Sequence, residues 1–352
     1  MFDTILQKAI SNIDTICSVL KINDDLRELL FSQDNSGRQI LAQHEQFTSL
    51  LENIPQRKDW QICDHCTAVT QLYAVYESFV EKLILEWLQV VPQLFPNYLD
   101  LEPKIQNAHR EGIGRLLIEL NKNRFKELTA EKVMQGFLAG VTGSTTYELL
   151  PEAFLSQDQN LRQEVLEKLF ADVGINKAWS WLIKYRKIKK FMVEIRGDQS
   201  TAEAELKRFL DYRNDAAHGG VDKILINEIL PTQDLLNLGI FVKALCHALA
   251  ELVTYQIITR KEIINQAKQI GKVTEWFRQP RAAVAQVKEC TLSKGDSIWL
   301  IGEAISFCKI ATIESMQIDG NAVERQEITT ETEVGLKFNL DVKKGMYLYL
   351  VK

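Results

Sequence analysis

An arginine, an asparagine and a histidine near position 215 have the residue types and spacing that suit RNA cleavage without a metal ion. Arg213 and Asn214 are adjacent, and His218 follows just before two glycines. A histidine titrates near neutral pH, so His218 suits a general base for a 2′-hydroxyl or a general acid for the leaving 5′-oxygen. An arginine stays charged and binds two phosphate oxygens at once, so Arg213 suits the phosphate on which charge builds. Asn214 would orient either group or bind the phosphate.

The three residues lie at the end of a predicted helix over residues 201–217. A good N-cap precedes this segment, and a pair of glycines follows it. On a regular helix Asn214 and His218 share a face, whereas Arg213 lies about 140° from His218. In one copy of the chain, the side chains of Arg213 and His218 therefore do not point towards the same place. The alternative interpretation is that Arg213 and His218 only cap the helix, because cations are favoured at its negative C-terminal end.

The elements that must position these groups are predicted to be helices throughout residues 1–268. The strongest pattern covers residues 68–91, where apolar residues recur with the i, i+3, i+4, i+7 spacing of a wide buried face. Two prolines follow and are expected to end this helix. Further helices are predicted near residues 113–121, 159–170, 179–196 and 233–267.

One carboxylate on the 68–91 helix is a candidate partner for the motif. Glu77 falls at the edge of the predicted buried face. A carboxylate in that position is costly unless it is paired. We therefore expect Glu77 to reach Arg213 or His218 and orient them, and the alternative is an ordinary ion pair with a neighbouring helix.

The order Arg213, Asn214, three further residues and His218 resembles the signature of the HEPN superfamily of helical nucleotide-binding and ribonuclease domains. Residues 60–81 and 109–114 are similar to one bacterial HEPN subfamily that occurs in toxin and phage-defence contexts. The resemblance implies a multidomain chain with an all-α HEPN helical bundle over residues 1–268. It also implies a homodimer in which two copies of the motif face each other across a twofold axis and form one composite cleft.

By the same resemblance, the chain is a metal-independent endoribonuclease that acts as a toxin or phage-defence effector. His218 would be the acid or base, Arg213 the phosphate clamp, Asn214 the orienting group and Glu77 the supporting carboxylate. The products would carry 2′,3′-cyclic phosphate and 5′-hydroxyl ends. A neutralising antitoxin or a defence-complex partner is implied, and no cofactor. The alternative is a HEPN module without catalysis that binds RNA or protein in a larger complex.

A basic run over residues 184–190 is the best local patch for an RNA backbone in an otherwise acidic domain. It supplies four predicted RNA-binding residues: Lys184, Arg186, Lys187 and Lys190. The alternative is an ordinary solvated helix face. His109 and Arg110 are a further candidate pair for RNA, with a purely structural role as the alternative.

Residues 269–352 change character, because valine and isoleucine become dense and alternate with polar residues. Short alternating segments separated by glycine turns predict a small β-barrel. The order of strands and turns resembles the second domain of elongation factor Tu, although Glu331 stands where that family commonly has a glycine. The resemblance implies contact with tRNA or ribosome-associated RNA, and the alternative is a barrel for dimerisation or protein docking. The sequence lacks the phosphate-binding loop of GTPases, so no GTPase activity is predicted.

Composition and charge narrow the class of protein. The chain has 352 residues, of which 46% are hydrophobic and 25% charged, and this excludes a disordered chain or a small disulfide scaffold. Its net charge of −5 gives no general attraction to nucleic acid, so an RNA site must be a local patch.

The start lacks the apolar core of a signal peptide, and no apolar run is long enough to span a membrane. We therefore expect a cytoplasmic protein with reduced cysteines. Cys63 and Cys66 have no second cysteine pair, so no metal site is predicted.

Overall fold

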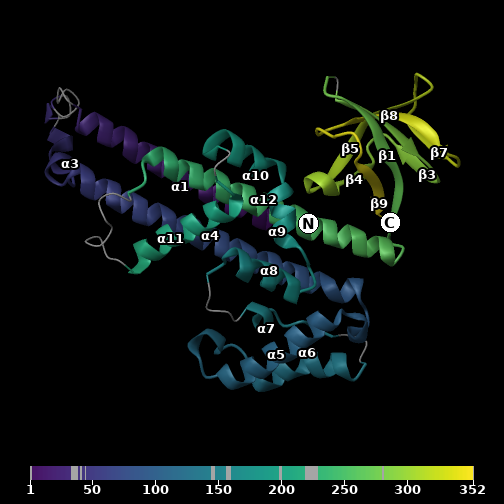
Figure 1. Cartoon of the computed structure of the whole chain (residues 1–352), viewed down its shortest axis with the longest axis horizontal. Coiled ribbons are helices and arrows are strands. Elements are labelled where there is room, and N and C mark those ends of the chain that lie inside the picture. The colour runs from purple at the N-terminus through teal and green to yellow at the C-terminus, as the bar shows by residue number, and fades with distance from the viewer. Residues whose placement is uncertain are drawn as a thin grey trace.

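The computed structural model describes residues 2–32, 39, 42–43, 45–143, 147–155, 160–197, 200–218, 229–279 and 281–351, apart from the side chains of Glu45, Leu50 and His218. Figure 1 shows a long helical bundle with a small barrel of strands at one end, beside α12 (Thr232–Ile263). The predicted order, an all-α region followed by a β-barrel, is confirmed. The change from helix to strand falls between Ile263 and Ala267.

The centre of the bundle is α4 (Arg57–Leu94), which packs against α1 (Asp3–Leu30), α11 (Ala202–His218) and α12. The apolar spacing predicted a helix over residues 68–91, and this prediction is confirmed because the apolar side chains on that face are buried. The helix is longer than predicted at both ends. It continues through Pro92 and ends two residues later, at Leu94.

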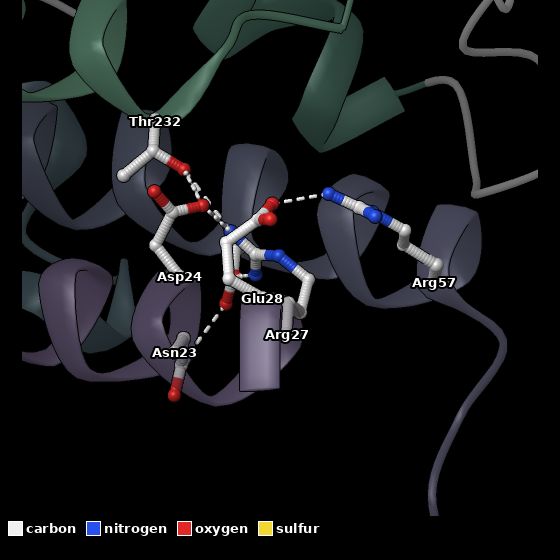
Figure 2. A network of polar contacts seen from close by, with 7 residues as sticks. Asn23, Asp24, Arg27, Glu28, Arg57 and Thr232 are labelled. Carbon is white, nitrogen blue, oxygen red and sulfur yellow. Dashed lines mark hydrogen bonds and ion pairs between the residues drawn. The ribbon is translucent and has the colours of Figure 1, made fainter. Parts of the chain in front are cut away.

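A buried polar network fastens α1 to α4 and α12 (Figure 2). Arg27 on α1 is 1% exposed and pairs with Asp64 on α4 and with Asp24 on its own helix. Its Nη2 also donates to Thr232 Oγ1 at the start of α12, 3.0 Å away. A buried guanidinium is tolerated only when its charge and N–H groups are compensated. This network therefore fixes the relative positions of three of the four central helices.

A second group of helices lies beside α4 and includes α5 (Pro103–Glu119) and α7 (Pro151–Leu155). α5 begins well before the predicted start at residue 113, with Pro103 in its first turn. Gly112 lets α5 approach α7 closely, because a Cβ at this position would overlap the carbonyl oxygen of Ala153. The remaining elements of this group are α6 (Ala130–Val141), α8 (Gln163–Asp172) and the short 3₁₀ turns Tyr98–Asp100 and Asn123–Phe125. The 3₁₀ turn Glu45–Phe47 and α3 (Thr48–Glu52) lie between α1 and α4 in the chain, at the other end of the bundle.

The prediction of one continuous helix over residues 179–196 is wrong. α9 (Ala178–Lys184) and α10 (Arg186–Phe191) are separated at Tyr185, whose backbone is extended with φ −63° and ψ 129°. The buried Tyr185 hydroxyl donates to Glu251 on α12, 2.9 Å away. Burial of the ring and this hydrogen bond favour the break over a continuous helix. The basic run is therefore divided between two helices, and a π-helical turn (Met192–Arg196) follows.

α12 carries a long apolar stretch. Among the described residues it alone is long and apolar enough to cross a membrane, but 78% of its most apolar stretch is buried inside the protein. A helix that is apolar on all sides and covered by protein is typical of a domain core.

The barrel closes through six antiparallel strands in the order β4, β9, β1, β2, β8, β5, with β5 pairing back to β4. The predicted turns at Gly295, Gly320 and Gly345 are confirmed, with φ of +90°, +77° and +90° that favour glycine. The strands are β1 (Ala267–Phe277), β2 (Ala282–Val287), β3 (Cys290–Ser293), β4 (Ser297–Gly302), β5 (Phe307–Ile318), β6 (Asn321–Ala322), β7 (Arg325–Ile328), β8 (Thr332–Phe338) and β9 (Tyr347–Val351).

The bundle and the barrel share a buried contact. Ile301, Cys308 and Tyr349 of the barrel belong to the same apolar core as α12. Glu251 on α12, which is 6% exposed, accepts hydrogen bonds from the Tyr185 hydroxyl and from the Cys308 backbone N–H, 3.1 Å away. The Lys309 ammonium lies 3.3 Å from the same carboxylate. The barrel is therefore held in a defined place at the end of the bundle.

Candidate functional site

Arg213 lies on α11, and its guanidinium is held from two sides. It covers the face of the Tyr73 ring on α4, with 4.5 Å from Cζ to the ring centroid. Its Nη1 donates to Asn160 Oδ1 and to Asn214 Oδ1, each 3.1 Å away. A cation stacked on an aromatic face and bonded to two amides has little rotational freedom. Among the described residues, both hydrogen bonds of the Arg213 guanidinium come from Nη1. Nε and Nη2 have no described partner and are therefore available for an anion.

The Asn214 amide oxygen contacts the arginine. Its Oδ1 accepts from Arg213 Nη1 and from Asn160 Nδ2, the latter at 2.8 Å. Asn160 precedes α8 and closes a triangle of side chains in which two asparagines hold one arginine. Sequence reasoning missed Asn160, because a single asparagine in a loop carries no periodic or motif signal.

Glu77 joins the cluster through Tyr73. The Tyr73 hydroxyl donates to Glu77 Oε1, 2.8 Å away and one helical turn further along α4, and accepts from the backbone N–H of Leu161 at 3.3 Å. Burial of the hydroxyl, and next its hydrogen bond to Glu77, raise the pKa of Tyr73. The phenol therefore stays neutral and keeps its ring available to the cation. Glu77 thus reaches the underside of Arg213 through an intermediate ring, and no described residue forms an ion pair with it.

His218 is the last residue of α11. Its imidazole is outside the described side chains, so its role stays a prediction. The structure brings Glu77, Arg213 and Asn214 into one cluster with Tyr73 and Asn160. We name these five residues the arginine cluster.

His65 is a second histidine beside α11 that sequence reasoning did not select as a candidate. Its ring contacts Tyr212 edge-on, with centroids 5.6 Å apart, and its Nδ1 accepts from the backbone N–H of Leu230 at 3.2 Å. Burial lowers the pKa of His65, and the nearby Asp215 carboxylate partly opposes this shift. Asp64, its neighbour, is bound to Arg27. The Cys63–Cys66 stretch therefore contributes side chains to the structure of the bundle.

The four predicted RNA-binding residues of the basic run are exposed. Lys184 ends α9, and Arg186, Lys187 and Lys190 lie on α10. α10 packs on α12, whereas α11 packs on α4 and α8, so the basic run is not part of the arginine cluster. Their RNA-binding role stays a prediction.

His109 requires a correction. The side chain is 0% exposed, stacks on Phe154 with centroids 5.6 Å apart, and lies 3.2 Å from the Tyr98 hydroxyl. Burial lowers its pKa to about 4. A neutral, fully buried imidazole has no surface to offer RNA, so the structural role is correct for His109. Arg110 is exposed and donates to Asn107 Oδ1, 2.8 Å away.

Comparison with protein families finds one family model that matches most of the helical part of the chain. The sequence model of the family described as RiboL-PSP-HEPN matches residues 19–255, which is more than half of the chain and includes the whole arginine cluster. Comparison with curated proteins gives no match.

Among solved structures, the C-terminal domain of a Geobacillus thermoleovorans protein described as a U32 peptidase is similar over 23% of this chain and 96% of that chain. The identity is 17% and the TM-score is 0.21. A TM-score this low does not identify the barrel, so its likeness to the second domain of elongation factor Tu stays a prediction.

Proposed function

We propose, because the chain belongs to the RiboL-PSP-HEPN family, that it is a metal-independent endoribonuclease whose site is the arginine cluster together with His218. HEPN families suggest a nuclease or RNA-binding role. The observation that carries the choice of site is the fixed guanidinium of Arg213, whose Nε and Nη2 have no hydrogen-bond partner among the described residues and would bind a phosphate. A cation held in place before substrate arrives stabilises developing charge without reorganisation.

The reaction needs few groups. The 2′-oxygen of one nucleotide attacks the neighbouring phosphorus, and the bond from phosphorus to the 5′-oxygen of the next nucleotide breaks. The 2′-hydroxyl loses a proton and the leaving oxygen gains one, so the products carry a 2′,3′-cyclic phosphate and a 5′-hydroxyl. His218 moves a proton at one of these oxygens. Arg213 binds the phosphate oxygens, on which negative charge increases as the phosphorus becomes five-coordinate.

A pair of chains would complete this site. Cleavage is fastest with both a base and an acid, and one chain supplies one motif histidine. Two copies related by a twofold axis would supply two histidines and two arginines to one cleft. We therefore propose a homodimer formed through the ends of the two α11 helices. We also propose that the chain acts on tRNA or ribosome-associated RNA as a toxin or defence effector, neutralised by a partner.

The experiment compares growth and RNA integrity in cells that express the wild type, His218→Ala, Arg213→Lys or Arg208→Lys. Arg208 is the matched control, because it lies on α11 and pairs with Glu205 at 3.0 Å, away from the arginine cluster. The proposal predicts arrested growth and cleaved RNA for the wild type and Arg208→Lys, and neither for the other two. Equal toxicity of all four proteins contradicts the assignment of the site.

A binding module without catalysis is the second candidate. It is favoured by one observation, that Arg213 already bonds two amides and a ring and so has a structural use. This candidate predicts that the wild type binds RNA or a protein partner without any turnover of RNA, and that His218→Ala leaves binding unchanged.

A further inference from the structure

Two neighbouring cavities lie beside α10, one where the helical bundle meets the barrel and one within the bundle. One has a volume of about 230 Å³ and is bounded by α10, by Glu251 of α12, by β5 and by the segment before β9. The other has a volume of about 360 Å³ and lies between α10 and α12. Lys187 on α10 lines both cavities and separates them. We name the two cavities together the junction groove.

Basic side chains outnumber acidic ones in the lining of the junction groove. They come from the bundle and from the barrel: Arg186, Lys187, Lys190, Lys243, Lys309 and Lys343. Three acidic residues share the lining, and each has a cationic partner: Glu194 with Lys190, Glu251 with Lys309, and Asp341 with Arg281. Within the described ranges, Arg186, Lys187 and Lys343 form no ion pair. A chain with a net charge of −5 thus gathers uncompensated positive charge at one place.

The cations of the groove are close enough to repel one another. Partial burial, followed by repulsion from Lys309, lowers the pKa of Lys187. Burial, followed by repulsion from Lys187, Lys309 and Lys243, lowers the pKa of His247 to about 4. Like charges gathered in a partly dehydrated place cost stability. A bound anion would remove that cost, so this arrangement is typical of a site for a phosphate.

Apolar surfaces lie on both sides of Lys187. The exposed side chains of Ile195 and Ile240 line the cavity between the helices, together with the buried Phe191 and Ala244. The half-buried Ile305 and Phe307 line the cavity at the barrel, together with the buried Met346. Single-stranded RNA presents bases that stack on apolar and aromatic surfaces and a backbone that needs cations. The order of surfaces in the groove, apolar, cationic, apolar, matches a base, a phosphate and a second base.

We infer that the junction groove binds single-stranded RNA, with one phosphate at Lys187 and the two flanking bases on the apolar surfaces. This inference rests on the proposed function for its choice of RNA, but it concerns binding at a surface apart from the arginine cluster. It gives the barrel a role, because Lys309, Lys343 and Phe307 complete a site that the helices alone leave open. A duplex would bind worse, since its bases are already stacked and paired.

The test measures fluorescence anisotropy of a labelled, 2′-O-methylated single-stranded RNA of about twelve nucleotides, which cannot be cleaved. Lys187→Glu and Lys343→Glu alter the groove. Lys189→Glu is the matched control, because Lys189 is an exposed lysine of α10 outside both cavities. We expect a loss of affinity of about tenfold or more for Lys187→Glu and a clear loss for Lys343→Glu, but about twofold or less for Lys189→Glu. The slope of log affinity against log salt should fall by about 0.7 for each lost phosphate contact.

Several outcomes would overturn the inference. Equal losses for Lys187→Glu and Lys189→Glu would show that only general charge matters. Equal affinity for a DNA duplex, or displacement of the RNA by poly-glutamate at equal charge concentration, would show that the groove does not recognise bases and phosphate together. Thermal melting of each variant confirms that the fold is intact.

The two proposals fail separately. A wild type that cleaves RNA while the groove variants bind normally supports the arginine cluster and overturns the junction groove. A wild type that cleaves no RNA, but loses RNA affinity with Lys187→Glu, overturns the ribonuclease and supports the groove. Arg208→Lys, which alters neither the arginine cluster nor the groove, should leave the affinity for the methylated RNA within about twofold of the wild type.

Discussion

Replacement of Glu251 by alanine tests how the barrel is held on the bundle. The carboxylate is 6% exposed and satisfies two buried donors, the Tyr185 hydroxyl at 2.9 Å and the Cys308 N–H at 3.1 Å. Each donor left without an acceptor costs about 1–3 kcal/mol. The Lys309 side chain is 41% exposed, so the loss of its partner adds little. Burial of the Glu251 carboxylate costs desolvation energy, and this burial raises its pKa. Removal of the carboxylate recovers that energy and offsets part of the loss. We therefore expect Glu251→Ala to lower the free energy of unfolding by about 2–4 kcal/mol.

The assay is urea denaturation, followed by both circular dichroism and tryptophan fluorescence. Glu303→Ala is the matched control, because Glu303 is an exposed carboxylate that accepts from the Tyr255 hydroxyl at 2.8 Å on the same boundary. This control should change the free energy of unfolding by less than about 1 kcal/mol. Limited proteolysis should also cut Glu251→Ala faster between α12 and β1. A change below about 1 kcal/mol for Glu251→Ala would refute the reasoning that this carboxylate fixes the barrel.

The remaining predictions concern the cluster, pH and packing. Arg213→Lys should slow RNA cleavage by about 10²–10³-fold in a gel assay with excess enzyme, because an ammonium cannot fork onto phosphate or stack on Tyr73 in the same way; an unchanged rate contradicts this role. The folded pKa of His109 is about 4, below its ordinary value, so the unfolded chain binds protons more readily. The free energy of unfolding should therefore fall as the pH drops from 6.5 towards 4. His109 should account for up to about 3 kcal/mol of this loss. Urea titrations at several pH values check this, and His109→Phe should flatten part of the slope. Gly112→Ala should lower the melting temperature by several degrees, because its Cβ would overlap the Ala153 carbonyl oxygen; an unchanged melting temperature would show that α5 and α7 can separate.

The features that the sequence predicted correctly depend on local patterns. The helix over residues 68–91 follows from the spacing of its apolar residues, and the barrel strands follow from alternation between glycine turns. The position of Arg213 beside Asn214 on one helix end is equally local.

The features that the sequence did not predict depend on distant partners. The break at Tyr185 needs the carboxylate of Glu251, which lies 66 residues further along the chain. Asn160 reaches Arg213 across 53 residues, and nothing in its own surroundings in the sequence announces that contact.

His109 is a different case, because the sequence held the signal. It shares a helical face with Ile105, Gly112 and Leu116, and these residues are buried. That spacing predicts a core position once α5 is allowed to begin at Pro103. The error in the assignment of His109 to RNA binding came from a helix start placed too late.

The most direct measurement of the central claim is the cleavage of a labelled RNA by the purified chain in the presence of EDTA, with mass spectrometry of the new ends. The account predicts 2′,3′-cyclic phosphate and 5′-hydroxyl ends from the wild type and no cleavage by His218→Ala at an unchanged melting temperature. Cleavage that stops with EDTA, or that continues at full rate in His218→Ala, would contradict it.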